Sequence, residues 1–181
     1  MQKIPKKGTY VVHLTKEDCR KMLEVRTPLE LLAVTMATRN VDEKGKTELE
    51  GAAAMMECAA SNVDYRDYRT FHEADLAFHR KIWEISGNEY FSISLERIIA
   101  GLFAFVLMEQ ASADHAAFVA AAQVHRSIVR GICSGDPEQA RQAFVANTLG
   151  FWSEYHQVEV DRKLICADLS ETETTKSSPS Y

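Results

Sequence analysis

The stretch FHEADLAFHRKIWEIS, residues 71–86, contains the pattern that decides the fold. At about 100° per residue, its large apolar side chains share one broad face of a helix and its charged side chains share the other. Asp75 and His79, four residues apart, lie in the middle of the apolar face, and His72 lies on the same side. The stretch therefore predicts an amphipathic helix that directs a carboxylate and an imidazole into a protein core.

The same helical period recurs along the chain, in long segments of good helix formers. Capping and breaking residues separate these segments: Thr15 with Asp18, a capping box at Thr27–Glu30 with Pro28 at the first helical position, Gly87–Asn88, and Gly135–Gln139. The predicted helices span about residues 16–25, 28–40, 43–61, 67–86, 89–110, 114–134 and 137–163. We expect an all-α fold, an antiparallel bundle of six to seven helices with short connections.

The two ends of the chain differ from the helical segment. Gly8–Val12 is β-prone, and we expect it to be half of a hairpin whose partner strand is missing. The tail, residues 165–181, is rich in Ser, Thr, Glu and Lys and is expected to be disordered. The predicted organisation is an N-terminal remnant (1–14), a helical domain (15–164) and this tail.

Bulk composition narrows the class of protein. With 181 residues, of which 46% are hydrophobic and 26% charged, the chain is expected to be one soluble globular domain. No apolar run is long enough to cross a membrane, so a cytoplasmic location is expected. The net charge of −5 argues against independent DNA binding. The four cysteines (Cys19, Cys58, Cys133 and Cys166) are scattered, which predicts reduced thiols rather than disulfides or a zinc thiolate site.

Polar residues also lie at the centres of apolar stripes on two other predicted helices. His125 occupies this position on the helix over 114–134, and Asn147 on the last helix, with Glu154 two turns further along. Burying such groups without partners costs several kcal/mol, so they are expected to meet one another, a ligand or an ion. Carboxylate and imidazole ligands suit zinc, manganese, nickel or iron. The alternative is a buried hydrogen-bonded cluster without a metal, and spacing alone favours that alternative.

Several motifs together resemble a known family. Residues 71–79 followed by 85–88 resemble the D-x-x-F-H … s-G-N signature of the FCD effector domain, which defines the FadR subfamily of GntR transcription regulators. Residues 24–30 are similar to its E-V-R-x-x-L-E segment, 124–128 to its H-x-x-I segment, and 136–147 to its D-x-x-x-A…H-L segment. The resemblance covers about residues 15–160. The segment Ile4–Val11 looks like the end of the wing of the family's winged-helix domain, whose helix-turn-helix is not in this chain.

The resemblance implies a helical bundle whose central pocket binds a small metabolite, often a carboxylate. In many members one Asp and three His hold a divalent metal there, which points to Asp75, His79, His125 and the position of Asn147. Asn147 departs from the family pattern, because an amide oxygen is a weaker ligand for a transition metal than imidazole. His72 and Glu154 are candidate substitute ligands, although an exposed or ion-paired role is the favoured alternative for each. The family also implies a homodimer, with DNA as a partner of a full-length form.

Arg26 is the candidate anchor for an anionic effector, because a guanidinium binds a carboxylate through two parallel hydrogen bonds. An ion pair with Glu30, four residues on, is the equally weighted alternative. We therefore predict a non-enzymatic, effector-sensing domain of a GntR/FadR-type regulator. A metal-dependent enzyme on a helical bundle and a dimerisation module with a decayed pocket are the alternatives.

Overall fold

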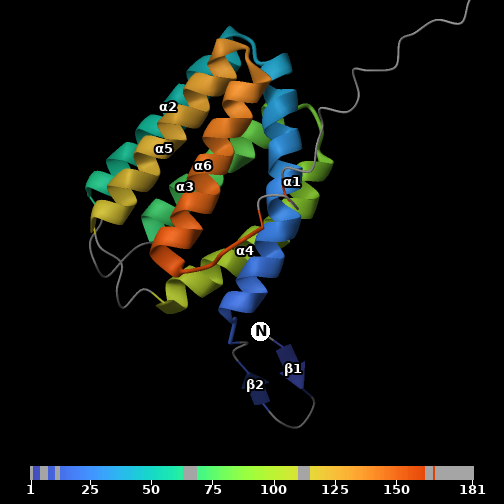
Figure 1. Ribbon diagram of the computed structural model, residues 1–181, viewed down its shortest axis with the longest axis vertical. Coiled ribbons are helices and arrows are strands. Elements are labelled where there is room, and N and C mark those ends of the chain that lie inside the picture. Colours follow the sequence, from blue (N-terminus) through green and yellow to red (C-terminus); the bar gives the residue numbers. More distant parts are fainter. Residues whose placement is uncertain are drawn as a thin grey trace, which may run out of the picture.

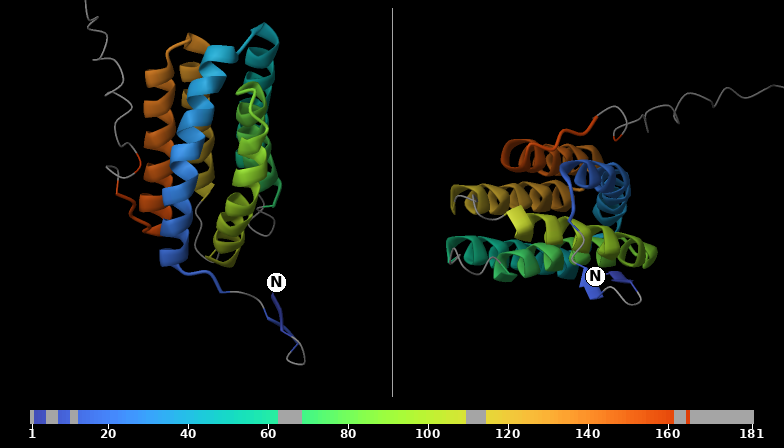
Figure 2. Two further views of the ribbon diagram at one scale, coloured as in Figure 1. Left: turned by 90° about the vertical axis from the view of Figure 1, so that its right-hand side faces the viewer. Right: turned by 90° about the horizontal axis from the view of Figure 1, so that it is seen from below.

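The computed structural model describes residues 2–4, 8–10, 13–62, 69–109, 115–161 and 165. Its element order is β1 (Gln2–Ile4), β2 (Gly8–Tyr10), α1 (Lys16–Asn40), α2 (Glu43–Ser61), α3 (Arg69–Ile85), α4 (Tyr90–Glu109), α5 (His115–Ser134) and α6 (Pro137–His156). The six helices form a bundle with their long axes roughly aligned (Figures 1 and 2). The all-α prediction is confirmed for the part of the chain that the structure describes.

Helix boundaries agree with the local capping signals at most points. Thr15 and Asp18 form a reciprocal capping box at the start of α1, and Asp136 caps α6 by accepting from the backbone N–H groups of Glu138 and Gln139. Gly87 has φ +75° between α3 and α4, a conformation that glycine adopts without steric cost. These local signals hold because their partners lie within four residues in the sequence.

The predicted break at Thr27–Pro28 is wrong, because α1 runs through Pro28 as one helix of 25 residues. Proline removes one backbone hydrogen bond from a helix interior and usually bends or ends it. Here Arg26 and Glu30 form an ion pair across the proline on the buried face of the helix. Thr27 is buried and its hydroxyl has no hydrogen-bond partner among the described residues, so it does not act as a cap. Tertiary burial of this face therefore overrides the local stop signal.

Two further boundaries differ from expectation. Helix α6 ends at His156, not near residue 163, because Gln157 adopts the left-handed conformation (φ 52°) and the Val158 N–H bonds back to the Trp152 carbonyl. Val158 is then buried beside Trp152. The expectation that the N-terminal strand has lost its partner is also wrong, since β2 pairs antiparallel with β1. A three-residue strand is too short to show an alternating pattern in the sequence.

The packing of the helices positions the centre of the bundle. Helix α1 packs against α3, α4 and α6, while α2 packs against α3 and α5, and α5 against α6. Gly131 permits the close approach of α5 to α6, because a Cβ there would lie 2.6 Å from the Cα of Ala140. The main core gathers apolar side chains from all six described helices, with Phe78, Trp83, Ile128 and Phe144 among its largest buried members.

The expectations for the cysteines, the C-terminal tail and membrane spans can be compared with the described residues. Cys19, Cys58 and Cys133 are free thiols, whereas Cys166 lies outside the described residues. Ile165 is buried in the main core, and residues 166–181 of the predicted tail also lie outside the described part. In the ranges that are described, every helix is too short or too polar to cross a membrane.

Candidate metal and effector site

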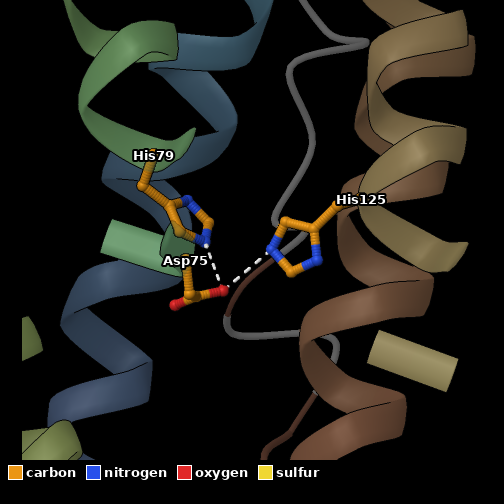
Figure 3. Close-up of side chains that lie close together, drawn as sticks. All are labelled: Asp75, His79 and His125. Carbon is orange, nitrogen blue, oxygen red and sulfur yellow. Dashed lines mark ion pairs between the residues drawn. The ribbon is translucent and has the colours of Figure 1, made fainter. Parts of the chain in front are cut away.

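Asp75, His79 and His125 come together at the centre of the bundle. Each offers one ligand atom, and these atoms lie within 4.8 Å of one another. Asp75 lies between the two rings: its Oδ1 is 2.9 Å from His125 Nε2 and 3.9 Å from His79 Nε2 (Figure 3). The i, i+4 spacing on α3 places Asp75 and His79 on one face, and packing of α5 against the bundle brings His125 opposite them.

The hydrogen bonds of His125 define which ring nitrogen faces the cluster. Its Nδ1 lies 2.7 Å from the Ala121 carbonyl oxygen, which can only accept, so Nδ1 carries the proton. In the neutral ring, Nε2 then presents a lone pair. This atom is buried and close to the Asp75 carboxylate, but it is poorly aligned and makes no hydrogen bond in the described part of the chain. His125 Nε2 and Asp75 Oδ1 are then two acceptors 2.9 Å apart, an arrangement that a proton or a cation between them stabilises.

In His79, as in His125, Nδ1 carries the proton and Nε2 is the acceptor. Its Nδ1 faces the carboxylate of Glu30, with 3.3 Å to Oε2, and its Nε2 accepts from Arg26 Nη2 at 3.1 Å. A carboxylate behind one imidazole and a carbonyl behind the other are the partners that orient metal-ligating histidines and raise their basicity. First-row metal ions bond N and O ligands at about 2.0–2.2 Å, so opposed ligands lie at most about 4.4 Å apart. Closing the cluster from 4.8 Å requires only small side-chain shifts.

Glu30 is the functional residue that the sequence analysis did not single out as part of the site. Its side chain is fully buried, and it accepts from Arg26 Nε at 3.1 Å and from Trp83 Nε1 at 3.1 Å, besides facing His79. The sequence placed Glu30 in a capping box with Thr27 or in an ion pair with Arg26, and the structure shows the ion pair. The usable signal was an acidic residue within the apolar face of α1, next to Leu31 and Ala33.

The electrostatics favour two ionised carboxylates in this interior. Burial alone would raise the pKa of Glu30, but His79, Arg26 and the Trp83 N–H lower it to about 2. Burial opposes ionisation of Asp75 too, yet the nearby His125, His79 and Arg26 side chains hold the pKa of Asp75 well below its usual range. Both groups are therefore anionic at neutral pH.

The lowered pKa of Glu30 predicts part of the acid sensitivity of the fold. Because its folded-state pKa of about 2 lies below the ordinary value of 4.5, the unfolded chain binds more protons in acid. The stability that Glu30 contributes is present above about pH 5 and is lost as the pH falls through the window from about 4.5 to 2. Urea unfolding at a series of pH values should show this loss in the wild type and a smaller loss in Glu30→Gln. Equal pH slopes for the two proteins would contradict the assignment.

The cluster opens into a cavity of about 60 Å³. Its lining comes from five helices: Arg26 of α1; Phe71, His72, Asp75 and His79 of α3; Ile99, Leu102, Phe103 and Val106 of α4; Ala121 and His125 of α5; and Asn147, Thr148, Phe151 and Trp152 of α6. Every sequence-predicted site residue is in this lining, Asn147 and Arg26 included. The candidate substitute His72 also lines the cavity, whereas Glu154 is exposed and is not among the lining residues.

Comparison with known proteins identifies the family of the chain. The family model described as FCD domain matches residues 21–147, which is most of the chain. The chain belongs to the FCD domain family. The predicted family is therefore confirmed, and the match favours it over the alternative of a metal-dependent enzyme.

Two proteins illustrate the relationship. The chain is 28% identical over 144 residues to a protein of Paenarthrobacter nicotinovorans named as a probable D-xylose utilization operon transcriptional repressor. That match covers 80% of this chain and 61% of the relative, so the chain spans about three fifths of the relative's length. The E. coli McbR/YncC structure superposes with a TM-score of 0.70 at 18% identity, covering 84% of this chain and 76% of that one. This second likeness concerns the fold.

Proposed function

We propose that this FCD domain senses a small carboxylate, which it binds in the central cavity together with a divalent metal ion. The observation that carries the proposal is that Asp75 Oδ1 lies near the Nε2 atoms of both His79 and His125. In each ring the other nitrogen, Nδ1, faces an oxygen that accepts its proton, which leaves Nε2 free to bind an ion. Asp75, His79 and His125 would hold the ion, with Asn147 on the adjoining wall. When bound, the ion supplies positive charge that attracts an anion in a water-poor interior.

The cavity favours a small effector. Space of about 60 Å³ corresponds to about four to six water-sized centres at about 10–15 Å³ each. Acidic, imidazole and guanidinium groups form one side, while Leu102, Phe103 and Phe151 provide apolar wall. Thr148 offers a hydroxyl for a polar substituent. The pocket therefore suits a short-chain carboxylate, such as a hydroxy acid or a sugar acid, better than a long acyl chain.

The proposal is tested by metal analysis followed by ligand-induced thermal shifts on the full chain. Short carboxylates, five-carbon sugar acids and D-xylose should be compared with and without Zn²⁺ or Mn²⁺, against uncharged analogues of the acids. We expect stabilisation by at least one carboxylate, and a larger stabilisation when the metal is present. A chain that retains no metal and responds to no anion would instead support the dimerisation module with a decayed pocket.

Asn147 gives a sharper test of the metal. Asn147→His would place a third imidazole on the wall where the family has its fourth ligand, and imidazole binds first-row ions more strongly than an amide oxygen. We expect Zn²⁺ affinity to rise by about tenfold, equivalent to about 1.4 kcal/mol. Calorimetric titration of the chelator-treated protein measures it, and Gln142→His on the exposed side of α6 is the control. Unchanged affinity would remove Asn147 from the proposed ligand set.

A further prediction concerns DNA. With a net charge of −5 and no recognition helix in the described part, the 181-residue chain alone should show no sequence-specific DNA binding. A gel shift at low salt measures this, and specific retention of one sequence over others would overturn it.

We also propose a homodimer, as two-fold operators require, and light scattering at high protein concentration tests that assembly.

A further inference from the structure

Arg26 is held at two points inside the cavity. Its Nε donates to Glu30 Oε1 at 3.1 Å, and its Nη2 lies 3.1 Å from Nε2 of His79. The side chain is almost fully buried, so these contacts replace hydration of the guanidinium. The contact with Glu30 lies within α1, whereas the contact with His79 joins α1 to α3.

The contact with His79 uses the ring's available lone pair. Because a guanidinium only donates, Nε2 of His79 must accept, and the proton of the neutral ring resides on Nδ1, which faces Glu30. Nε2 is also the His79 atom that faces Asp75, at 3.9 Å from its Oδ1. One lone pair cannot accept the Arg26 N–H and bind an ion at the same time.

We infer that Arg26 competes with the metal for His79 and becomes the effector's carboxylate anchor when the metal displaces it. This inference rests on the proposed function and adds the order of events within the site. In the metal-free chain, Arg26 Nη2 bonds His79. Ion binding breaks that hydrogen bond, while the Nε–Glu30 bond keeps the guanidinium at the cavity wall.

Displacement leaves two positive charges side by side in a poorly hydrated space, the ion and the guanidinium with unpaired N–H donors. Such an arrangement is unfavourable by itself. A carboxylate that bridges the two satisfies the donors and offsets the repulsion, so ion and anion should each raise the other's affinity by the same factor. A purely structural Arg26–Glu30 pair predicts no such coupling.

The test is calorimetric titration of Zn²⁺ into the chelator-treated full chain, without and with acetate as the anion probe. Arg26→Met removes the competitor and should bind Zn²⁺ about tenfold more tightly than wild type, the effect of losing one charge-assisted hydrogen bond. Acetate should tighten Zn²⁺ binding in the wild type and do so less in the variant. The matched control is Arg69→Met, which removes the same type of i, i+4 Arg–Glu pair from the surface of α3 and should change neither quantity.

The double variant Arg26→Met/Glu30→Gln removes both buried charges together and serves if Arg26→Met alone does not fold. If the wild type binds Zn²⁺ and the folded variants bind it equally or more weakly, the inference is overturned. The proposed metal site would still be supported. Binding by the variants but not by the wild type would support it in its strongest form. If none of these proteins binds Zn²⁺ or another first-row ion, the inference and the proposed metal site both fail.

Discussion

Glu30→Gln should destabilise the fold by about 3–5 kcal/mol, the usual cost of leaving a buried charge without its partner. The carboxylate is fully buried and makes polar contacts with Arg26, His79 and Trp83 at the same time. A neutral amide keeps the volume but leaves the Arg26 guanidinium without a counter-ion, and its NH₂ group would face donors. Urea or guanidinium unfolding followed by circular dichroism measures the change in free energy.

Glu73→Gln is a closely matched control. Arg69 and Glu73 repeat the Arg-to-Glu spacing and the Nε–Oε1 contact of Arg26 and Glu30, but both side chains are mostly exposed. Surface pairs of this type contribute about 0–1 kcal/mol, so the control should remain near wild-type stability. If both variants lost the same small amount, Glu30 would be an ordinary ion pair, and its role in orienting His79 and Arg26 would be excluded.

If the protein holds the proposed metal ion, a chelator should lower the melting temperature, and added metal should raise it again. An ion at about 100 times its dissociation constant stabilises the folded state by about 2.7 kcal/mol. For a chain of this size, that corresponds to a shift of about 5–10 °C. The physical reason is that the ligands lie on α3 and α5, so the ion links two helices and offsets the burial of Asp75. Thermal scans with chelator and with added Zn²⁺ or Mn²⁺ measure it.

The histidine variants distinguish this effect from general stabilisation by cations. His79→Ala should abolish most of the metal-dependent shift, whereas His13→Ala, at an exposed position before α1, should retain it. A melting temperature that ignores both chelator and metal would mean that Asp75 and the two histidines form a buried cluster without an ion. The cavity would then bind its effector directly, with Arg26 as the first residue to test.

The repeated helical period and the local caps were readable from the sequence, because they depend on residues within about one turn of each other. That period alone placed Asp75 and His79 on one apolar face and directed His125 and Asn147 inward. Family motifs then indicated that these residues share one pocket. The bundle and the inward placement of Asp75, His79, His125 and Asn147 were therefore predictable from the sequence.

Only the tertiary structure decided how these groups are paired. Glu30 meets His79 and Trp83 across sequence separations of 49 and 53 residues, which no local pattern encodes. The same contacts carry α1 through Pro28, where the local rules place a break. They also determine that His79 directs Nε2 toward Arg26 and the cluster, since the polarity of an imidazole depends on which partner faces its other nitrogen. The sequence by itself thus determined which faces are buried, and packing between α1, α3 and α5 decided which buried polar atoms remain available for a ligand.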